Sequence, residues 1–273
     1  MREQGQIGII TGAASGIGRA LALELGRRGV TLVVSDIDGA GAEQVAAAIN
    51  AMRPDSARAV TLDVTDAEAV AALVRDTVAQ HGRLDLMFNN AGISITGDAR
   101  DLSIAQWRRV IDINLMGVIY GSDAAYKAMA AQGSGHIVNS ASLAGLVPFP
   151  TNAPYGATKH AVVGLSLALR AEGEDLGVRV SAVCPGFVDS NIFNATEVVN
   201  ASREKLIANI PFKKVSVDEA AVRILDGVAR NRAMIVFPAY AQLLWWGYRL
   251  VPDLLAPLGR RLIRDLRKIR GSA

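Results

Sequence analysis

Cysteine is almost absent from this 273-residue sequence, and its single copy, Cys184, excludes an intrachain disulfide framework. One unpaired cysteine is typical of a reducing compartment, and only Met1 to Gly5 precede the first apolar run. We therefore expect no cleaved leader peptide and a cytoplasmic location. Histidine is also scarce: His81, His136 and His160 lack metal-ligand spacing, so we expect no metal site.

The chain has no hydrophobic run suited to spanning a bilayer, because its apolar stretch at 239–251 is broken or bounded by Pro238, Arg249, Pro252 and Asp253. Positive charge is unevenly spread. Residues 249–273 hold seven Lys or Arg and two Asp, a charge of +5, so the formal total of +3 leaves −2 for residues 1–248. A slightly acidic body lacks the basic stripes of a nucleic-acid-binding surface, and we expect no nucleic-acid partner.

The chain does contain a regular alternation of short runs rich in Val and Ile with longer amphipathic segments. The short runs are almost continuously hydrophobic, as is typical of parallel strands covered on both faces. We expect strands at Gln6–Ile10, Thr31–Ser35, Ala59–Leu62, Leu84–Phe88, His136–Asn139, Val178–Cys184 and Met234–Phe237. We expect helices at Ile17–Arg28, Gly41–Met52, Ala67–Gln80, Ile104–Ala131, Pro154–Asp175 and Val217–Arg230. This alternation predicts an α/β fold with a doubly wound parallel sheet of about seven strands.

The length suits one large domain, and no linker, repeat or low-complexity tract suggests a second. We expect this domain to span residues 1–238, with a substrate loop at about 187–215, followed by an aromatic and basic extension at 239–273. Ser103-x-x-Gln106 and Ser216-x-x-Glu219 have capping-box spacing and mark two helix starts. Cys184 lies in an apolar strand, where we expect a core residue and not a nucleophile.

A glycine-rich segment, Thr11-Gly12-Ala13-Ala14-Ser15-Gly16-Ile17-Gly18, joins the first expected strand to the first expected helix. Glycines here permit a tight turn, close backbone approach to a pyrophosphate and an anion at the helix N-terminus. The spacing is G-x-x-x-G-x-G and not the commoner G-x-G-x-x-G. A purely structural turn is the alternative, but the position between strand and helix favours a dinucleotide site.

Asp36 comes directly after the second strand, 24 residues beyond Gly12. A carboxylate there can accept hydrogen bonds from both hydroxyls of an adenosine ribose, and it would repel a 2′-phosphate. No basic residue occupies the positions where it would neutralise that phosphate, Ala14, Ser15 and Ile37. Asp36 could instead cap the next helix, but Asp38 is better placed to do so. We therefore favour NAD(H) over NADP(H).

Tyr155 and Lys159 are four residues apart, a spacing that puts both on one face of a helix. A free tyrosine has a pKa near 10 and is a poor base at neutral pH. A cation at about 4 Å, with an effective dielectric of about 20, would favour the phenolate by roughly 4 kcal/mol before desolvation. Ser142 lies thirteen residues before the tyrosine and could hydrogen-bond a substrate oxygen. An exposed helical pair is the alternative reading of this spacing.

Taken together, these segments resemble the short-chain dehydrogenase/reductase family, with a match from about Gln6 to Pro238. The matching signatures are Thr11–Gly18, Asp63-Val64, Asn89-Asn90-Ala91-Gly92, Asn114, Ser142, Tyr155 with Lys159, and Pro185-Gly186. Their order along the chain makes the resemblance specific. It implies a Rossmann-type fold, a nicotinamide cofactor and hydride transfer between an alcohol and a carbonyl group.

The resemblance also implies a role for each matching residue. Tyr155 would be the general acid/base, Lys159 would lower its pKa and hold the nicotinamide ribose, and Ser142 would orient the substrate oxygen. Ser140 is a rival for the serine role, but the thirteen-residue spacing selects Ser142. Asn114 would fix a water in the proton relay. The implied cofactor contacts are Gly12, Ser15, Gly16, Ile17, Gly18, Asp36, Asp63, Val64, Asn90, Ala91, Gly92, Tyr155, Lys159, Pro185, Gly186, Val188 and Ser190. Ser190 stands where similar chains usually carry Thr, so a hydroxyl is retained.

The segments expected to face the substrate are Ser94–Gly97, Leu143–Thr151 and Phe187–Pro211. Their apolar members are Leu146, Val147, Phe149, Phe187, Ile192 and Phe193. These segments hold no arginine pair suited to a phosphate or carboxylate. They favour a hydrophobic alcohol or ketone, although the same side chains could simply pack a lid.

Three roles are open to the extension, in which an aromatic cluster at 243–248 is followed by basic residues from Arg260. It could lie on an anionic membrane, cover the substrate site or pack on a neighbouring subunit. The resemblance implies a homodimer or homotetramer formed through the two long helices that precede strands five and six. Two rival functions stay open: an NADP(H)-dependent carbonyl or 3-oxoacyl reductase, which Asp36 disfavours, and a non-catalytic nucleotide-sensing scaffold, which the intact Asn114, Ser142, Tyr155 and Lys159 set disfavours.

Overall fold

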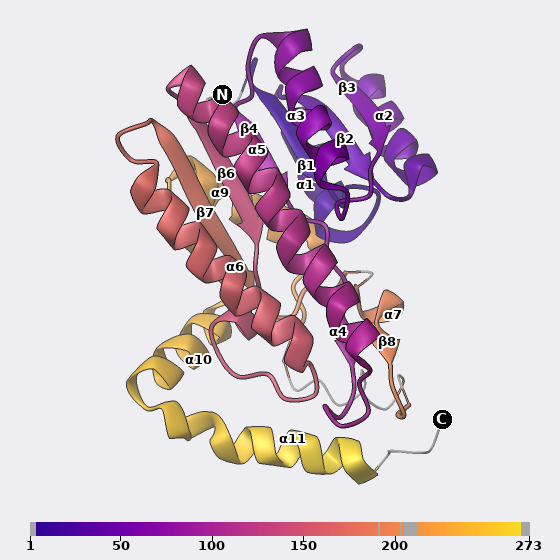
Figure 1. Cartoon of the computed structure of the whole chain (residues 1–273), viewed down its shortest axis with the longest axis vertical. Helices are drawn as coiled ribbons and strands as arrows, with labels where there is room; N and C mark the ends of the chain where they lie inside the picture. Colours follow the sequence, from indigo (N-terminus) through magenta and orange to yellow (C-terminus); the bar gives the residue numbers. More distant parts are fainter. Residues whose placement is uncertain (1–3, 191, 203, 205–211, 269–273) are drawn as a thin grey trace.

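A computed structural model describes residues 4–190, 192–202, 204 and 212–268, and within them seven parallel strands form one sheet in the order β3-β2-β1-β4-β6-β7-β9 (Figure 1). The strands are β1 (Ile7–Thr11), β2 (Thr31–Asp36), β3 (Ala57–Thr61), β4 (Leu86–Asn89), β6 (Gly135–Ser140), β7 (Val178–Pro185) and β9 (Met234–Phe237). Chain order reverses between β1 and β4, as in a doubly wound Rossmann-type sheet. The predicted fold class is confirmed.

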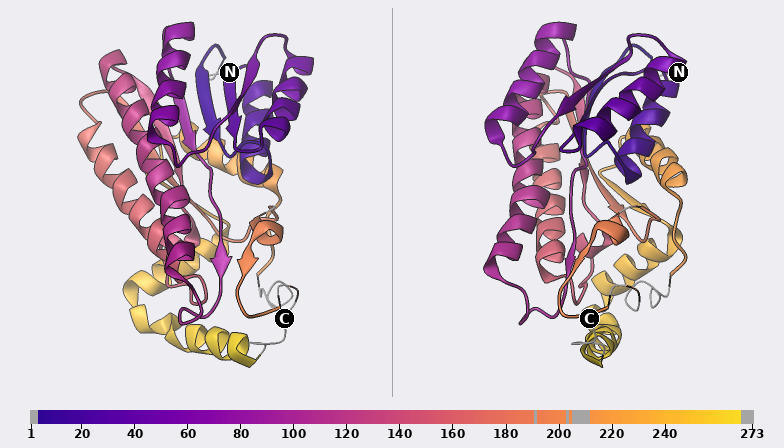
Figure 2. Two further views of the ribbon diagram at one scale, coloured as in Figure 1. Left: turned by 45° about the vertical axis from the view of Figure 1, so that its right-hand side comes forward. Right: turned by 90° about the vertical axis from the view of Figure 1, so that its right-hand side faces the viewer.

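Helices cover both faces of this sheet (Figure 2). One layer contains α3 (Ala67–His81), α4 (Ile104–Ile111), α5 (Gly117–Gln132) and α6 (Ala153–Glu172). The opposite layer contains α1 (Gly16–Arg27), α2 (Gly39–Met52) and α9 (Val217–Ala229). Each layer buries an apolar stripe: Leu21 and Ile224 lie in one core cluster, and Leu73 and Met129 lie in another. Burial on both faces explains why the strands read as continuous hydrophobic runs.

The sequence predicts one continuous α-helix at Ile104–Ala131, and this prediction is wrong. The segment is divided into α4 and α5 by a π-helix of five residues, Asp112–Met116. Asn114 lies in this segment and is fully buried. A π-turn adds one residue to the helical repeat and so changes where the side chains point, which is why such turns are frequent at functional sites. The capping box is confirmed at Ser103 with Gln106, and the Ser216 hydroxyl accepts a hydrogen bond from the Glu219 amide.

Smaller elements lie beyond the carboxyl ends of the strands. β5 (Ile95–Thr96) pairs with β8 (Glu197–Val198) in a second, two-stranded sheet, and the short α7 (Ile192–Ala195) precedes β8. A 3₁₀ turn, Leu143–Gly145, links β6 to α6. These elements bring the three expected substrate-facing segments to one end of the sheet.

The extension forms two helices, α10 (Ala239–Leu250) and α11 (Ala256–Lys268), joined by a 3₁₀ turn at Pro252–Leu255. α10 packs Leu244 and Trp245 against the core, and α11 crosses the lower end of the molecule beneath α4 and α6 (Figure 1). Leu266 of α11 is buried, and the Arg267 guanidinium binds the buried Asp98 carboxylate with an Nε–Oδ2 distance of 2.8 Å. Within the described residues, no helix combines the length and apolarity needed to cross a membrane.

Candidate active site

A cavity of about 1000 Å³ opens at the carboxyl ends of β1, β2, β4, β6 and β7. Its size is at the upper end for a ligand site, and its position is the switch point where α/β sheets bind ligands. The predicted site residues that line it are Gly12, Ser15, Gly16, Ile17, Asp36, Asp63, Val64, Asn90, Ala91, Gly92, Ser142, Tyr155, Lys159, Pro185, Gly186, Val188 and Ser190. Gly18 and Asn114 lie behind this lining.

The glycine turn is shaped by close backbone approach. Gly12 has φ +65°, and a Cβ on it would lie 2.6 Å from the Ala91 Cα. A Cβ on Gly18 would collide with the Gly12 carbonyl oxygen and lie 2.6 Å from the Asn90 amide nitrogen. That amide nitrogen donates to the carbonyl oxygens of Thr11 and Gly12 at 3.2 and 3.1 Å. Gly18 and Asn90 therefore fix the turn from behind.

The N-terminus of α1 points at the cavity with its first-turn donors open to a ligand. Ser15 is the N-cap in extended conformation, and its side chain accepts no hydrogen bond from the first turn. Gly16 and Ile17, the first residues of the helix, line the cavity. Backbone N–H groups and the positive end of the helix dipole favour an anion here. The turn therefore fits the pyrophosphate of a dinucleotide.

Asp36 lies at the end of β2, on the rim of the cavity next to the glycine turn. Its carboxylate accepts hydrogen bonds from the amides of Ala14 and Asp38, at 2.9 and 3.0 Å. The alternative cap role falls to Asp38, whose side chain accepts from the Gly41 amide at the start of α2. Both oxygens of Asp36 are thus held in place by the backbone, and each keeps a further lone pair for a ligand hydroxyl.

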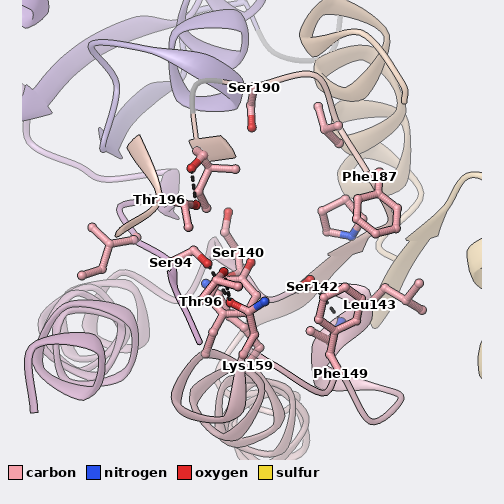
Figure 3. Close-up of a pocket in the computed structure, with 18 of the residues that line it drawn as sticks. Ser94, Thr96, Ser140, Ser142, Leu143, Phe149, Lys159, Phe187, Ser190 and Thr196 are labelled. Atoms are coloured by element: carbon pink, nitrogen blue, oxygen red, sulfur yellow. Dashed lines mark hydrogen bonds between the residues drawn. The ribbon is translucent and has the colours of Figure 1, made fainter. Parts of the chain in front are cut away.

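Ser142 follows β6, and Tyr155 and Lys159 lie in the first two turns of α6; all three line the cavity. Figure 3 shows Ser142 and Lys159 on the same side of it. The Lys159 ammonium lies 5.5 Å from the centroid of the Tyr155 ring and donates to the Ser140 carbonyl oxygen at 2.6 Å. The Ser142 hydroxyl accepts a hydrogen bond from the Ala144 amide at 3.1 Å. The rival serine, Ser140, donates its hydroxyl to Asn90 and contributes its carbonyl to Lys159.

Burial is the main cause of the pKa shifts of the ionisable groups in this cluster. It raises the pKa of Tyr155 above its ordinary value, and the hydrogen bond from Ser142 opposes the rise. Burial lowers the pKa of Lys159 to about 8. This differs from the expectation that Lys159 lowers the tyrosine pKa, because the ammonium is directed to a backbone carbonyl and not to the phenol oxygen. Burial also raises the pKa of Cys184 to about 12, and this fully buried thiol is a core residue, as expected.

Asn114 supports the site from inside the π-helix. Its amide group makes two hydrogen bonds to Ile93, donating to the carbonyl at 2.9 Å and accepting from the N–H at 2.8 Å. A Cβ on Gly92 would lie 3.2 Å from the Asn114 Oδ1 and 3.6 Å from the Lys159 Nζ. Asn114 therefore positions the segment after β4 beside the lysine. Its expected role in holding a water stays a prediction.

Two residues of the site carry no motif in the sequence. The Tyr240 hydroxyl of α10 accepts a hydrogen bond from the Phe187 amide at 2.7 Å, and its ring stacks on Phe212 at 4.6 Å. Asn152 accepts hydrogen bonds from the hydroxyls of Ser94 and Thr96, at 3.0 and 2.9 Å. Tyr240 holds the turn after β7, and Asn152 joins the segment after β4 to α6.

The substrate end of the cavity is mainly apolar. Phe149 and Phe187 lie 6.0 Å apart, near Ser142 and Leu143 (Figure 3). Val147 and Ile192 also line the cavity, whereas Leu146 packs in the core next to it. α10 adds Leu244, and α11 adds Leu258, Leu262 and Leu266. Of the expected segments, 191, 203 and 205–211 lie outside the described residues, as does the Phe193 side chain.

The fold and this cluster define a short-chain dehydrogenase/reductase. The family model described as "short chain dehydrogenase" matches residues 6–199, and the chain belongs to this family of oxidoreductases. Members of this fold bind a nicotinamide cofactor.

Three relatives illustrate the similarity. The chain is 35% identical to the Mycobacterium tuberculosis "Probable oxidoreductase EphD" over 92% of its own length, and it spans only 44% of that protein. It is 40% identical to the "Cyclohexanol dehydrogenase" of an Acinetobacter species, with 71% of this chain and 78% of that protein covered. A Burkholderia phymatum short chain dehydrogenase/reductase, solved in complex with NAD, has a TM-score of 0.82 at 29% identity, covering 92% of this chain and 96% of that chain.

Proposed function

We propose that this protein is an NAD(H)-dependent oxidoreductase that interconverts a hydrophobic secondary alcohol and its carbonyl compound. The observation that carries the proposal is the convergence of Ser142, Tyr155 and Lys159 on the cavity that Asp36 and the glycine turn also line. A nicotinamide, when bound, accepts or supplies the hydride. The open N-terminus of α1 supports binding of the pyrophosphate, and Asp36 supports NAD(H) over NADP(H) because a carboxylate repels a 2′-phosphate.

Proton transfer falls to Tyr155. Ser142 would hydrogen-bond the substrate oxygen and hold it within reach of the phenol, which takes or gives the hydroxyl proton. Lys159, charged below its pKa of about 8, supplies a buried cation 5.5 Å from the phenol ring and a donor for ribose hydroxyls.

Support for a hydrophobic substrate comes from the walls of the cavity. Phe149 and Phe187 lie near Ser142, and Leu262 of α11 also lines the cavity, so a substrate without charge would bury its apolar surface there. The relative named cyclohexanol dehydrogenase agrees with an alicyclic or similarly apolar alcohol. The basic Arg261 and Lys268 lie at the α11 rim of the cavity, where Asp265 is their ion-pair partner.

A screen of alcohols with NAD⁺ and NADP⁺, repeated with Tyr155→Phe, tests the proposal. We expect NAD⁺ reduction with apolar secondary alcohols, and a loss of at least about 10²-fold in kcat in Tyr155→Phe with NADH binding retained, because general acid–base catalysis supplies about 10²–10⁴-fold. Phe149→Tyr is a control that keeps ring size in the substrate wall. Undiminished turnover in Tyr155→Phe, or turnover of small charged substrates only, would contradict the proposal.

We also propose a homodimer or homotetramer built on α5 and α6. These two long helices lie side by side on one face of the sheet (Figures 1 and 2), and α6 exposes Leu167 there. Light scattering of the purified chain measures the mass in solution, and Leu167→Glu is expected to lower it. A monomeric wild-type protein would contradict this proposal.

A further inference from the structure

The outer face of α10 exposes three large apolar side chains. Leu243 is 73% exposed, Trp246 is 52% exposed and Leu250 is 76% exposed, and they lie three to four residues apart on one face of the helix. Val251 extends the same surface beyond the helix end. Scattered single apolar residues are normal on a surface, but a contiguous group of this kind marks an interaction site. We call Leu243, Trp246, Leu250 and Val251 the apolar strip.

The opposite faces of the same two helices are already in use. α10 turns Leu244 and Tyr240 inward, and α11 turns Leu262 and Leu266 toward the cavity. Among the described residues, the packing of the fold therefore leaves the apolar strip uncovered, although the inner face of α10 packs on the core. α10, which carries these exposed side chains, lies at the lower left in Figure 1.

The two helices of the extension also carry exposed positive charge. Arg249 is exposed within the same face of α10, and Arg260 and Arg264 are exposed on α11. None of these three arginines forms an ion pair with any residue in the described part of the chain, whereas Asp265 is already bound by Arg261 and Lys268. The segment from residue 249 onward carries +5, and the remainder of the chain carries −2. Within the described residues 249–268, six Lys or Arg stand against two Asp, so the two helices that carry the apolar strip have a net positive charge.

We propose that α10 and α11 form a docking surface for an anionic lipid bilayer. An exposed tryptophan with two leucines suits the boundary between headgroups and acyl chains, and basic residues beside them suit negatively charged headgroups. A second copy of this chain fits less well. A two-fold symmetric contact would place the strip against itself and bring Arg249, Arg260 and Arg264 close to their own copies. The charge pattern therefore selects a negative surface.

Binding of α10 and α11 to a bilayer would place the cavity close to the bilayer surface. The same two helices provide both the docking surface and one wall of the cavity, to which they contribute Leu244, Leu258 and Leu262. The enzyme would then meet an apolar substrate where such compounds concentrate. This consequence rests on the proposed function, but the docking surface does not.

Vesicle sedimentation with the full-length chain tests the docking surface. The probes are vesicles of phosphatidylcholine alone and vesicles in which about 30% is replaced by phosphatidylserine. We expect binding to the anionic vesicles that weakens with salt, and little binding to the neutral ones. Leu243→Ser combined with Trp246→Ser should weaken binding at least about tenfold, and Arg264→Gln about fivefold, the factor expected for one basic residue at such a surface.

Matched changes at the opposite end of the molecule serve as controls. Leu176 is an exposed residue in the turn after α6, and Arg75 is an exposed residue of α3. We therefore expect Leu176→Ser and Arg75→Gln to leave vesicle binding unchanged. Circular dichroism melting confirms that each variant is folded. Absence of binding to anionic vesicles, or equal binding by wild type and the Leu243→Ser/Trp246→Ser variant, would overturn the proposal. So would a fall in oligomeric mass in that variant without loss of vesicle binding, since the strip would then be an interface between copies.

Discussion

Replacing Asp36 with asparagine isolates the charge that is proposed to select the cofactor. The amide is nearly isosteric, and its oxygen can still accept the hydrogen bond that the carboxylate takes from Ala14 at 2.9 Å. The position of the side chain between β2 and the glycine turn is therefore retained. What is lost is the negative charge at the rim of the cavity, together with the acceptor for the Asp38 amide at 3.0 Å.

The magnitude follows from Coulomb's law. A doubly charged 2′-phosphate about 4 Å from a carboxylate is disfavoured by about 2 kcal/mol in water and about 8 kcal/mol at an effective dielectric of 20. Asp36 is only half-buried, so the lower figure applies, which corresponds to roughly 30-fold in an equilibrium constant. We expect the wild-type protein to prefer NAD⁺ by at least about this factor in kcat/KM, and Asp36→Asn to lose most of the preference.

The assay compares kcat/KM for NAD⁺ and NADP⁺ with one alcohol at fixed ionic strength. Asp38→Asn is the matched control, since Asp38 caps α2 and does not line the cavity. It should lower the melting temperature slightly and leave the cofactor ratio unchanged. A wild-type preference for NADP⁺, or an unchanged ratio in Asp36→Asn, would refute the reasoning.

Two further predictions concern residues outside the catalytic cluster. Tyr240→Phe removes the hydroxyl that accepts the hydrogen bond of the Phe187 amide at 2.7 Å, and loss of one such bond costs about 1 kcal/mol. We expect kcat/KM for NAD⁺ to fall about fivefold, and kinetics equal to wild type would show that the turn after β7 does not need this bond. Burial lowers the pKa of His136 to about 3, so below the ordinary pKa of 6.5 the unfolded chain binds a proton that the folded chain does not, and stability falls with pH from 6.5 toward 3. Urea unfolding should show a loss of about 2 kcal/mol near pH 5 relative to pH 7, and a smaller loss in His136→Gln; equal losses in the two proteins would count against this assignment.

Much of the fold could be predicted because each strand is an unbroken apolar run and each helix is amphipathic. Some boundaries differ: β3 begins at Ala57 and not Ala59, and β4 begins at Leu86 and not Leu84. β5 and β8 were not anticipated, since each has two residues and pairs with a segment about 100 positions away. A strand of two residues is too short to show the alternation of apolar and polar side chains by which strands are predicted.

The same distinction applies to the site. Residues such as Asp36, Ser142 and Lys159 could be placed because each follows a strand or shares a helix face with its partner. Tyr240 could not, because its hydrogen bond to Phe187 joins residues 53 positions apart and depends on how α10 packs. The pKa of Tyr155 could not be predicted either. The spacing suggested a neighbouring cation, but the burial that raises the pKa is a property of the folded chain.

The wall that α10 and α11 add to the cavity lies outside the part of the chain that the family model matches. The family match ends at residue 199, before Phe212, Leu244 and Leu262 enter the chain. The glycine turn, Asp36 and the Ser142, Tyr155 and Lys159 cluster all lie within that match, whereas the apolar wall of the cavity combines Phe149 and Phe187, which lie within it, with these later residues. Substitutions in α10 and α11 can therefore reshape one wall of the cavity while the glycine turn and the Ser142, Tyr155 and Lys159 cluster stay in place.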